Sequence, residues 1–124
     1  MARADILIVD DDPSLLHFAA RYLGRLGHGV LAARGEQEAW DRFVQAPEGL
    51  RLVLIDVSME QDSGEALARR MLAANPGLRL LFWSGYPFDV DQFAASAPGV
   101  RVEFLHKPFS PALLRSAVER LLAD

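Results

Sequence analysis

The stretch Ile6-Leu7-Ile8-Val9-Asp10-Asp11-Asp12-Pro13 passes from four apolar residues directly to three aspartates and a proline. Apolar runs of this kind, rich in β-branched residues, indicate a buried strand. An aspartate followed by a proline is typical of a helix start, because Asp12 can cap free backbone N–H groups and Pro13 fits the first turn. The stretch therefore predicts a strand, an acidic turn and then a helix.

Four more short apolar runs predict four further strands. The five predicted strands span Ile6 to Val9, Gly29 to Ala33, Leu52 to Ile55, Leu78 to Trp83 and Val100 to Leu105. Apolar residues at helical spacing follow each strand, and the last helix has Ser110 at its N-cap and Pro111 in its first turn. Strict alternation of strands and helices predicts an α/β protein with a parallel sheet covered by helices on both faces.

Proline and glycine mark the expected helix ends, at Leu26-Gly27, Pro47-Glu48-Gly49, Asn75-Pro76-Gly77 and Pro98-Gly99. The fourth helix, within Phe88 to Ala97, is expected to be short. Phe18, Trp40 and Phe43 fall at helical spacing, and we expect them in the core together with Trp83.

Composition limits the class of protein. The chain has 124 residues, 51% of them hydrophobic and 24% charged, with no cysteine and a net charge of −4. These values predict one soluble domain over residues 1–124 without disulfides or thiol chemistry. A mildly acidic chain is a poor direct ligand for nucleic acid, and no apolar stretch is long enough for a signal peptide or a membrane span. We therefore expect a cytoplasmic protein.

Polar residues stand at the ends of four predicted strands. They are Asp10, Asp11 and Asp12 after the first strand, Asp56 after the third, Ser84-Gly85 after the fourth and His106-Lys107 after the fifth. The carboxyl ends of parallel strands share one edge of the sheet, where ligands bind. These side chains are therefore expected to meet.

Each of these residues has an ordinary structural explanation when taken alone. Asp12 can cap a helix, Ser84 can belong to a turn, and Lys107 can be a solvated lysine. Together, however, three carboxylates at one edge repel each other unless a cation joins them, and oxygen ligands suit Mg²⁺ or Mn²⁺. Lys107 is the single lysine among 13 basic residues. A carboxylate beside a metal, a hydroxyl and an ammonium can accept a phosphoryl group as an acyl phosphate.

The stretches Leu7 to Pro13, Leu54 to Met59, Ser84-Gly85 and Phe104 to Phe109 resemble the receiver domains of two-component response regulators. The resemblance covers essentially the whole chain, with the motifs in the family's order. It implies a flavodoxin-like, doubly wound fold with five parallel strands in the order 2-1-3-4-5.

The resemblance also assigns an acceptor and a metal site. Asp56 would be the phosphoacceptor, and Asp11 would bind Mg²⁺ directly together with Asp56. Asp10 would act on the metal through water, and Ser58 would contribute its backbone carbonyl.

A second group of residues would carry the switch in the family. Ser84 would supply the switch hydroxyl, Lys107 would pair with the phosphoryl oxygens, and Phe104 would change rotamer. The peptide bond before Pro108 is expected to be cis, as is usual in the family.

Some positions depart from the common pattern. Glu60 stands where many receivers carry proline, and Ser63-Gly64 stands where Asp-Gly is frequent. Ser63 can cap the third helix. Ser58 and Tyr86 occupy variable positions that tune the lifetime of the phosphoryl group in the family.

The function implied is a signalling module, not a metabolic enzyme. It would take a phosphoryl group from the phosphohistidine of a histidine kinase or a histidine phosphotransfer domain, and signal through its fourth helix, fifth strand and fifth helix. A receiver module of a hybrid sensor kinase, a receiver used only for protein contacts and a flavin-binding protein are alternatives. Another is a Mg²⁺-dependent phosphohydrolase with an aspartyl nucleophile, but those enzymes carry a second acid where this chain has Ser58.

Overall fold

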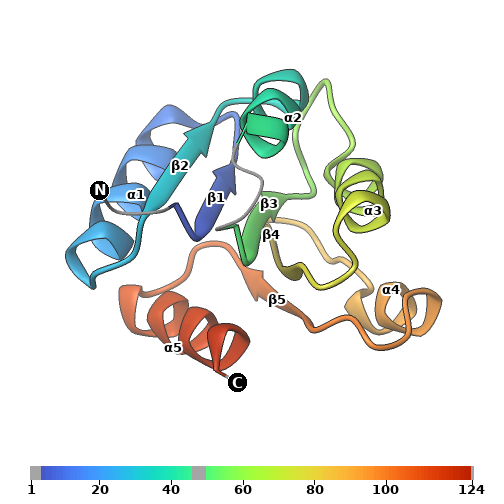
Figure 1. The fold of residues 1–124 in the computed structure, drawn as a ribbon. Coiled ribbons are helices and arrows are strands. Elements are labelled where there is room, and N and C mark those ends of the chain that lie inside the picture. The colour runs from blue at the N-terminus through green and yellow to red at the C-terminus, as the bar shows by residue number, and fades with distance from the viewer. Residues whose placement is uncertain (1–3, 46–49, 124) are drawn as a thin grey trace.

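The computed structural model describes residues 4–45 and 50–123, which form a five-stranded parallel sheet between two layers of helices (Figure 1). The strands are β1 (Ile6–Val9), β2 (Val30–Ala33), β3 (Leu52–Asp56), β4 (Arg79–Ser84) and β5 (Val102–His106). The helices are α1 (Pro13–Arg25), α2 (Glu36–Gln45), α3 (Gly64–Ala74), α4 (Val90–Ser96) and α5 (Pro111–Leu122). The strand order β2-β1-β3-β4-β5 confirms the predicted doubly wound, flavodoxin-like fold.

The sheet divides the core into two apolar layers. Helices α1 and α5 cover one face, and α2, α3 and α4 cover the other (Figure 1). Every residue of β1 and β3 is buried, whereas β2 and β5 lie at the edges and are half-buried over most of their length. This explains why the two central strands are almost continuously apolar in the sequence.

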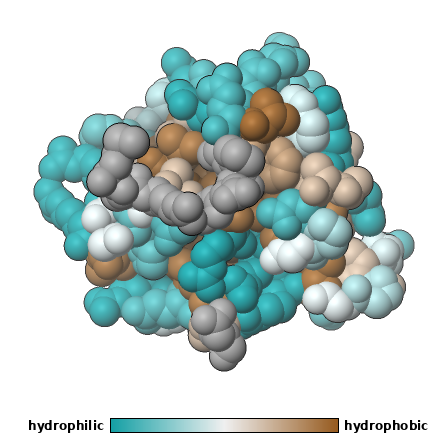
Figure 2. Space-filling model, in the orientation of Figure 1, coloured by the Kyte–Doolittle hydropathy of each residue, from teal (hydrophilic) through white to brown (hydrophobic). Residues whose placement is uncertain are grey.

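The face of the molecule shown in Figure 2 is largely hydrophilic. Figure 2 shows hydrophilic residues over most of the periphery in this view, with hydrophobic residues scattered between them. Within the described residues, no helix is both long and apolar enough to cross a membrane.

Side-chain caps fix the starts of the helices that border the carboxyl edge of the sheet. Asp12 accepts hydrogen bonds from the backbone N–H groups of Ser14 and Leu15, and Ser63 accepts one from Ala66. Ser110 accepts one from the third residue of α5, with Pro111 at the first position. These caps were predicted, and each contributes about 0.5–2 kcal/mol to stability.

Three strands extend one residue further than the sequence suggests. Asp56, Ser84 and His106 are the last residues of their strands, because the ladder continues through the register pairs Asp56–Trp83 and Ser84–His106. At the other end, β5 begins two residues later than expected. The backbone N–H of Val100 bonds to the carbonyl of Ala97 instead of joining the sheet.

The ends of the helices largely follow the predicted signals. Gly27 and Gly99 adopt φ angles of 101° and 86°, a conformation that favours glycine, and each follows a helix. Helix α4 is short, as expected, and is confined to Val90–Ser96. The helix end expected at Pro47-Glu48-Gly49 lies outside the described residues.

One expected core residue is on the surface. Phe18 is 39% exposed and stacks on Tyr22, with ring centroids 5.8 Å apart. The prediction of a buried Phe18 was wrong because the buried face of α1 is formed by Leu16, Ala19 and Leu23. Trp83 is fully buried, as expected.

Candidate functional site

Three aspartates meet at the carboxyl edge of the sheet. Asp10 and Asp11 follow β1, and Asp56 ends the neighbouring strand β3. One carboxylate oxygen from each residue lies within 4.8 Å of the others. Asp10 and Asp56 are buried, with 0% and 3% exposure, whereas Asp11 is exposed. The cluster is thus held in the protein on one side and open to solvent on the other.

Lys107 joins two of these acids. Its Nζ donates to Oδ2 of Asp10 at 2.9 Å and to Oδ2 of Asp56 at 3.1 Å. The backbone N–H of Lys107 donates to the carbonyl of Ser84 at 2.8 Å, which fixes the start of the loop after β5. The Lys107–Pro108 peptide is cis, as predicted. The single lysine of the chain therefore lies inside the acid cluster.

The surroundings shift the pKa values of Asp10 and Lys107. Burial raises the pKa of Asp10 and the nearby charge of Asp56 raises it further, against the opposing hydrogen bonds from Lys107 and Asp12. Burial alone would lower the pKa of Lys107, but its hydrogen bonds and attraction to Asp10 and Asp56 outweigh this and raise it. Lys107 therefore stays charged at neutral pH.

The carboxylate of Asp56 is held at both oxygens. Its Oδ1 accepts hydrogen bonds from the backbone N–H of Ser58 at 2.7 Å and from the Ser58 hydroxyl at 2.6 Å. Its Oδ2 accepts the bond from Lys107. Because both oxygens accept hydrogen bonds, the carboxyl plane has a fixed orientation.

Ser84 lies on the neighbouring strand. It is 1% exposed, and its hydroxyl oxygen accepts a hydrogen bond from the backbone N–H of Tyr86 at 2.9 Å. The residue before it, Trp83, is the register partner of Asp56. The hydroxyl therefore stands at the same edge as the acids, and its own hydrogen remains available to donate.

The donor atoms of the cluster fit a hard divalent cation. They are carboxylate oxygens, which Mg²⁺ and Mn²⁺ prefer. The three acids and Lys107 carry a formal charge of about −2, which one divalent cation balances. The backbone N–H of Glu60 donates to Oδ2 of Asp11 at 3.3 Å, so the loop after β3 also borders this site.

Two contacts near that loop were not predicted from the sequence. A Cβ on Gly64 would lie 2.3 Å from the backbone oxygen of Asp56 and 2.8 Å from Cγ2 of Ile55, so the start of α3 packs directly on the acceptor strand. Oδ2 of Asp62 accepts a hydrogen bond from the backbone N–H of Glu36 at 2.9 Å. The Ser63-Gly64 pair was noted in the sequence, but no local sequence pattern indicates that Gly64 packs against Asp56.

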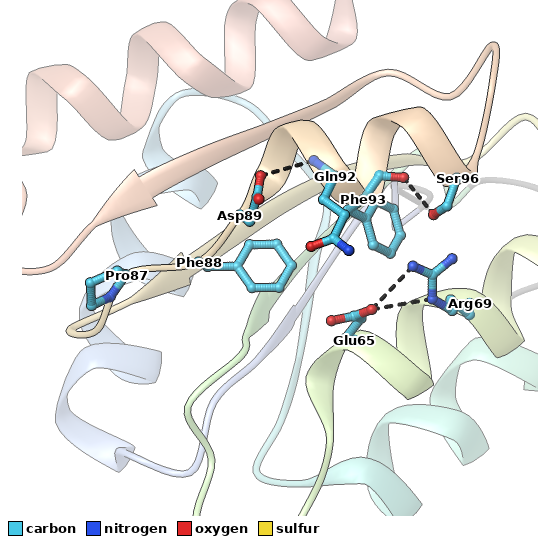
Figure 3. Close-up of a pocket in the computed structure, with 8 residues that line it drawn as sticks. All are labelled: Glu65, Arg69, Pro87, Phe88, Asp89, Gln92, Phe93 and Ser96. Atoms are coloured by element: carbon cyan, nitrogen blue, oxygen red, sulfur yellow. Dashed lines mark hydrogen bonds and ion pairs between the residues drawn. The ribbon is translucent and has the colours of Figure 1, made fainter.

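Phe104 is separate from the acids and faces α4. Its ring centroid lies 6.1 Å from that of Phe88, which packs on Phe82 at 4.9 Å. Phe88 also lines a cavity of about 440 Å³ between α3 and α4. Figure 3 shows its ring beside this cavity, with the ion pair of Glu65 and Arg69 on the side of α3. An aromatic contact thus links β5 to the start of α4.

A second cavity, of about 520 Å³, lies next to the acid cluster. It opens between the start of α1 and the loop after β5, and its lining residues are Asp12, Leu15, Phe18, Gly85, Lys107, Pro108 and Phe109. The exposed Phe18 thus contributes to an apolar wall beside Lys107.

Comparison with known proteins gives consistent matches. A family model described as the response regulator receiver domain matches residues 6–119. The chain is 34% identical over 122 residues to the DNA-binding transcriptional regulator NtrC of Azospirillum brasilense, a match that covers 98% of this chain and 25% of the relative. It is 28% identical over 117 residues to the response regulator receiver protein CpdR of Brucella abortus (strain 2308), covering 94% and 95%.

Solved structures agree with these matches. The receiver domain from the hybrid histidine kinase CckA has a TM-score of 0.82 and 27% identity, covering 97% of this chain and 100% of that one. The chain therefore spans about a quarter of the length of NtrC and nearly the whole of CpdR.

Proposed function

This chain belongs to the response regulator receiver domain family, a phosphoacceptor family of two-component signalling, and we propose that Asp56 is the residue that takes the phosphoryl group. The observation that carries the proposal is the contact of Asp56 with Lys107, whose Nζ lies 3.1 Å from Oδ2 of Asp56 and 2.9 Å from Oδ2 of Asp10. It pairs a buried carboxylate nucleophile with an ammonium at an edge that is open to solvent at Asp11.

The reaction is a transfer from a phosphohistidine. An oxygen of Asp56 attacks phosphorus and forms an acyl phosphate, while the bond from phosphorus to the imidazole nitrogen breaks and that nitrogen keeps the electron pair. The chain contributes a nucleophile whose carboxyl plane is already oriented by Ser58 and Lys107. Fixing this orientation before the donor arrives lowers the entropic part of the barrier.

Asp11, Asp56 and the backbone carbonyl of Ser58 would hold Mg²⁺ directly, and Asp10 would hold it through water. When bound, the ion supplies positive charge to the oxygens of the phosphoryl group. The fit rests on the oxygen atoms of Asp10, Asp11 and Asp56, which lie within 4.8 Å of one another.

Lys107 and Ser84 would respond to the new group. The Lys107 ammonium would exchange its bond to Asp56 for one to a phosphoryl oxygen while keeping Asp10 within reach. The Ser84 hydroxyl would donate to another phosphoryl oxygen. We propose that the resulting movement reaches α4 through Phe104 and Phe88, whose rings are in contact, and is recognised on the face formed by α4, β5 and α5.

The phosphodonor is a histidine kinase or a histidine phosphotransfer domain, and the phosphorylated form regulates a partner protein. We propose that residues 1–124 form one receiver domain, that it acts in the cytoplasm, and that it catalyses its own phosphorylation and dephosphorylation without being a metabolic enzyme. A phosphohydrolase is less well supported, because Ser58, two residues after Asp56, donates hydrogen bonds where such enzymes carry an acid.

Acetyl phosphate with MgCl₂ tests the proposal by intact-mass measurement. We expect the gain of one phosphoryl group in the wild type and in Asp62→Asn, which changes an acid outside the cluster, and no gain in Asp56→Asn. An equal gain in Asp56→Asn, or none in the wild type, would overturn the assignment.

A further inference from the structure

Trp83 lies beneath the loop that carries Lys107. It is the residue before Ser84 in β4, and it is fully buried. Its ring stacks on Phe109, with centroids 5.3 Å apart and an interplanar angle of 17°. The Nζ of Lys107 stands over the same ring, 6.0 Å from its centroid. One indole thus contacts two residues of the loop after β5, one on either side of Pro108.

The indole makes these contacts through its ring. Among the described residues, its Nε1 is buried without a hydrogen-bond partner. Leaving a buried donor unpaired costs stability, so hydrogen bonding does not account for an indole at this position. The backbone of Trp83 is fixed independently, because its carbonyl accepts the N–H of Val57 at 3.0 Å, directly after Asp56.

The ammonium of Lys107 needs a further contact to hold it at one point between Asp10 and Asp56. A lysine has a flexible four-carbon stem and a compact ammonium with freely rotating donors, so its hydrogen bonds alone do not define one position. An aromatic face attracts a cation at this distance, most strongly when the ring is an indole and the cation is partly shielded from water. Lys107 meets the second condition, since its side chain is 21% exposed.

We propose that Trp83 is a positioning residue for Lys107. Its ring face confines the ammonium to the place between Asp10 and Asp56, and the stacked Phe109 holds the loop from which Lys107 extends. The consequence for phosphoryl transfer rests on the proposed function, whereas the contact itself does not.

A double-mutant cycle tests the proposal with two independent measurements. Trp83→Leu, Lys107→Met and the double variant are compared by the initial rate of phosphorylation from acetyl phosphate at fixed MgCl₂, and by urea unfolding without Mg²⁺. Trp83→Leu should lower the rate about fivefold, the scale of a partly desolvated cation–π contact. It should lower the rate no further in the Lys107→Met background, because the effect acts through the ammonium.

Two further variants separate positioning from general packing. Trp83→Phe keeps an aromatic face and should restore most of the rate lost in Trp83→Leu. Trp40→Leu removes the other tryptophan, which lies on α2 with the guanidinium of Arg70 3.8 Å from its ring centroid. This variant should leave the rate unchanged after correction for the folded fraction.

The unfolding cycle should show a coupling of about threefold in the folding equilibrium constant between Trp83 and Lys107. Additive effects of Trp83→Leu and Lys107→Met in the unfolding cycle would overturn the contact, and additive effects on the rate would overturn the positioning role. A wild type that takes no phosphoryl group would overturn the proposed function instead, and the unfolding cycle would still decide whether Trp83 holds Lys107.

Discussion

Asp56 ends β3 and Lys107 follows β5, 51 positions later and on the far side of β4, yet Nζ of Lys107 is 3.1 Å from Oδ2 of Asp56. The same ammonium is 2.9 Å from Asp10, so it neutralises part of a buried acidic cluster. In the proposed reaction this contact must be exchanged for one to the incoming phosphoryl group.

Replacing Lys107 by arginine should slow phosphorylation although the charge is kept. A planar guanidinium is larger than an ammonium and cannot occupy the same point between Asp10 and Asp56. We expect the initial rate from acetyl phosphate to fall about tenfold, the equivalent of about one charge-assisted hydrogen bond. Wild-type kinetics in Lys107→Arg would show that the position requires only a positive charge.

Divalent cations should stabilise the protein through the acid cluster. At a concentration about 100 times the dissociation constant, Mg²⁺ should add about 2.7 kcal/mol to the free energy of unfolding. Thermal unfolding with MgCl₂ and with NaCl of equal ionic strength measures this directly. Asp11→Asn removes the exposed acid of the cluster and should lose most of the Mg²⁺ effect. An equal shift in NaCl, or in Asp11→Asn, would mean that the cations act elsewhere.

Asp10→Asn should stabilise the metal-free protein at neutral pH. The pKa of Asp10 is raised chiefly by burial, so its favourable contribution to stability is present below the unfolded value of 3.8 and is lost as the pH rises through the folded value. The ionised group is therefore a cost at pH 7, and asparagine can still accept the bond from the Asp12 N–H.

We expect the free energy of unfolding in urea to rise by about 1 kcal/mol at pH 7, the usual scale of a single substitution, because the buried charge is removed. The gain should shrink as the pH is lowered toward 4. Asp91→Asn, at an exposed position of α4, is the control for a simple change of net charge. A gain that is independent of pH, or equal in Asp91→Asn, would contradict this account.

Gly64→Ala should destabilise the protein and disturb the acceptor. The added Cβ would lie 2.3 Å from the backbone oxygen of Asp56, so the start of α3 must move away from β3. We expect a loss of about 1–3 kcal/mol and slower phosphorylation. Gly24→Ala is the matched control, because its Cβ meets nothing within 4 Å and alanine favours a helix by about 1 kcal/mol. Equal stability changes in the two variants would contradict the close packing of Gly64 against Asp56.

The sequence predicted those features that depend on local pattern. The apolar runs predicted the strands. The residues Asp12, Ser63 and Ser110 indicated helix starts, because an N-cap side chain bonds to a backbone N–H within three residues of itself. The acid cluster was also predictable, because parallel strands end at a common edge.

Features that depend on distant neighbours were missed. The contacts of Gly64 with Asp56 and of Asp62 with Glu36 join separate elements, and no local pattern reports them. The start of β5 was predicted two residues too early. Its pairing with β4 begins only at Val102, and this register depends on the neighbouring strand, not on the local sequence. Phe18 fits a helical spacing equally well on the surface, where it borders the cavity beside Lys107.

Borohydride trapping shows which residue carries the phosphoryl group. After incubation with acetyl phosphate and MgCl₂, borohydride reduces an aspartyl phosphate to homoserine with loss of phosphate, and peptide mass spectrometry identifies the altered residue. We expect homoserine at position 56 alone, and none in tryptic peptides from protein treated without the donor. Homoserine at Asp10 or Asp11, or no conversion of Asp56 in a protein that has gained a phosphoryl group, would contradict it.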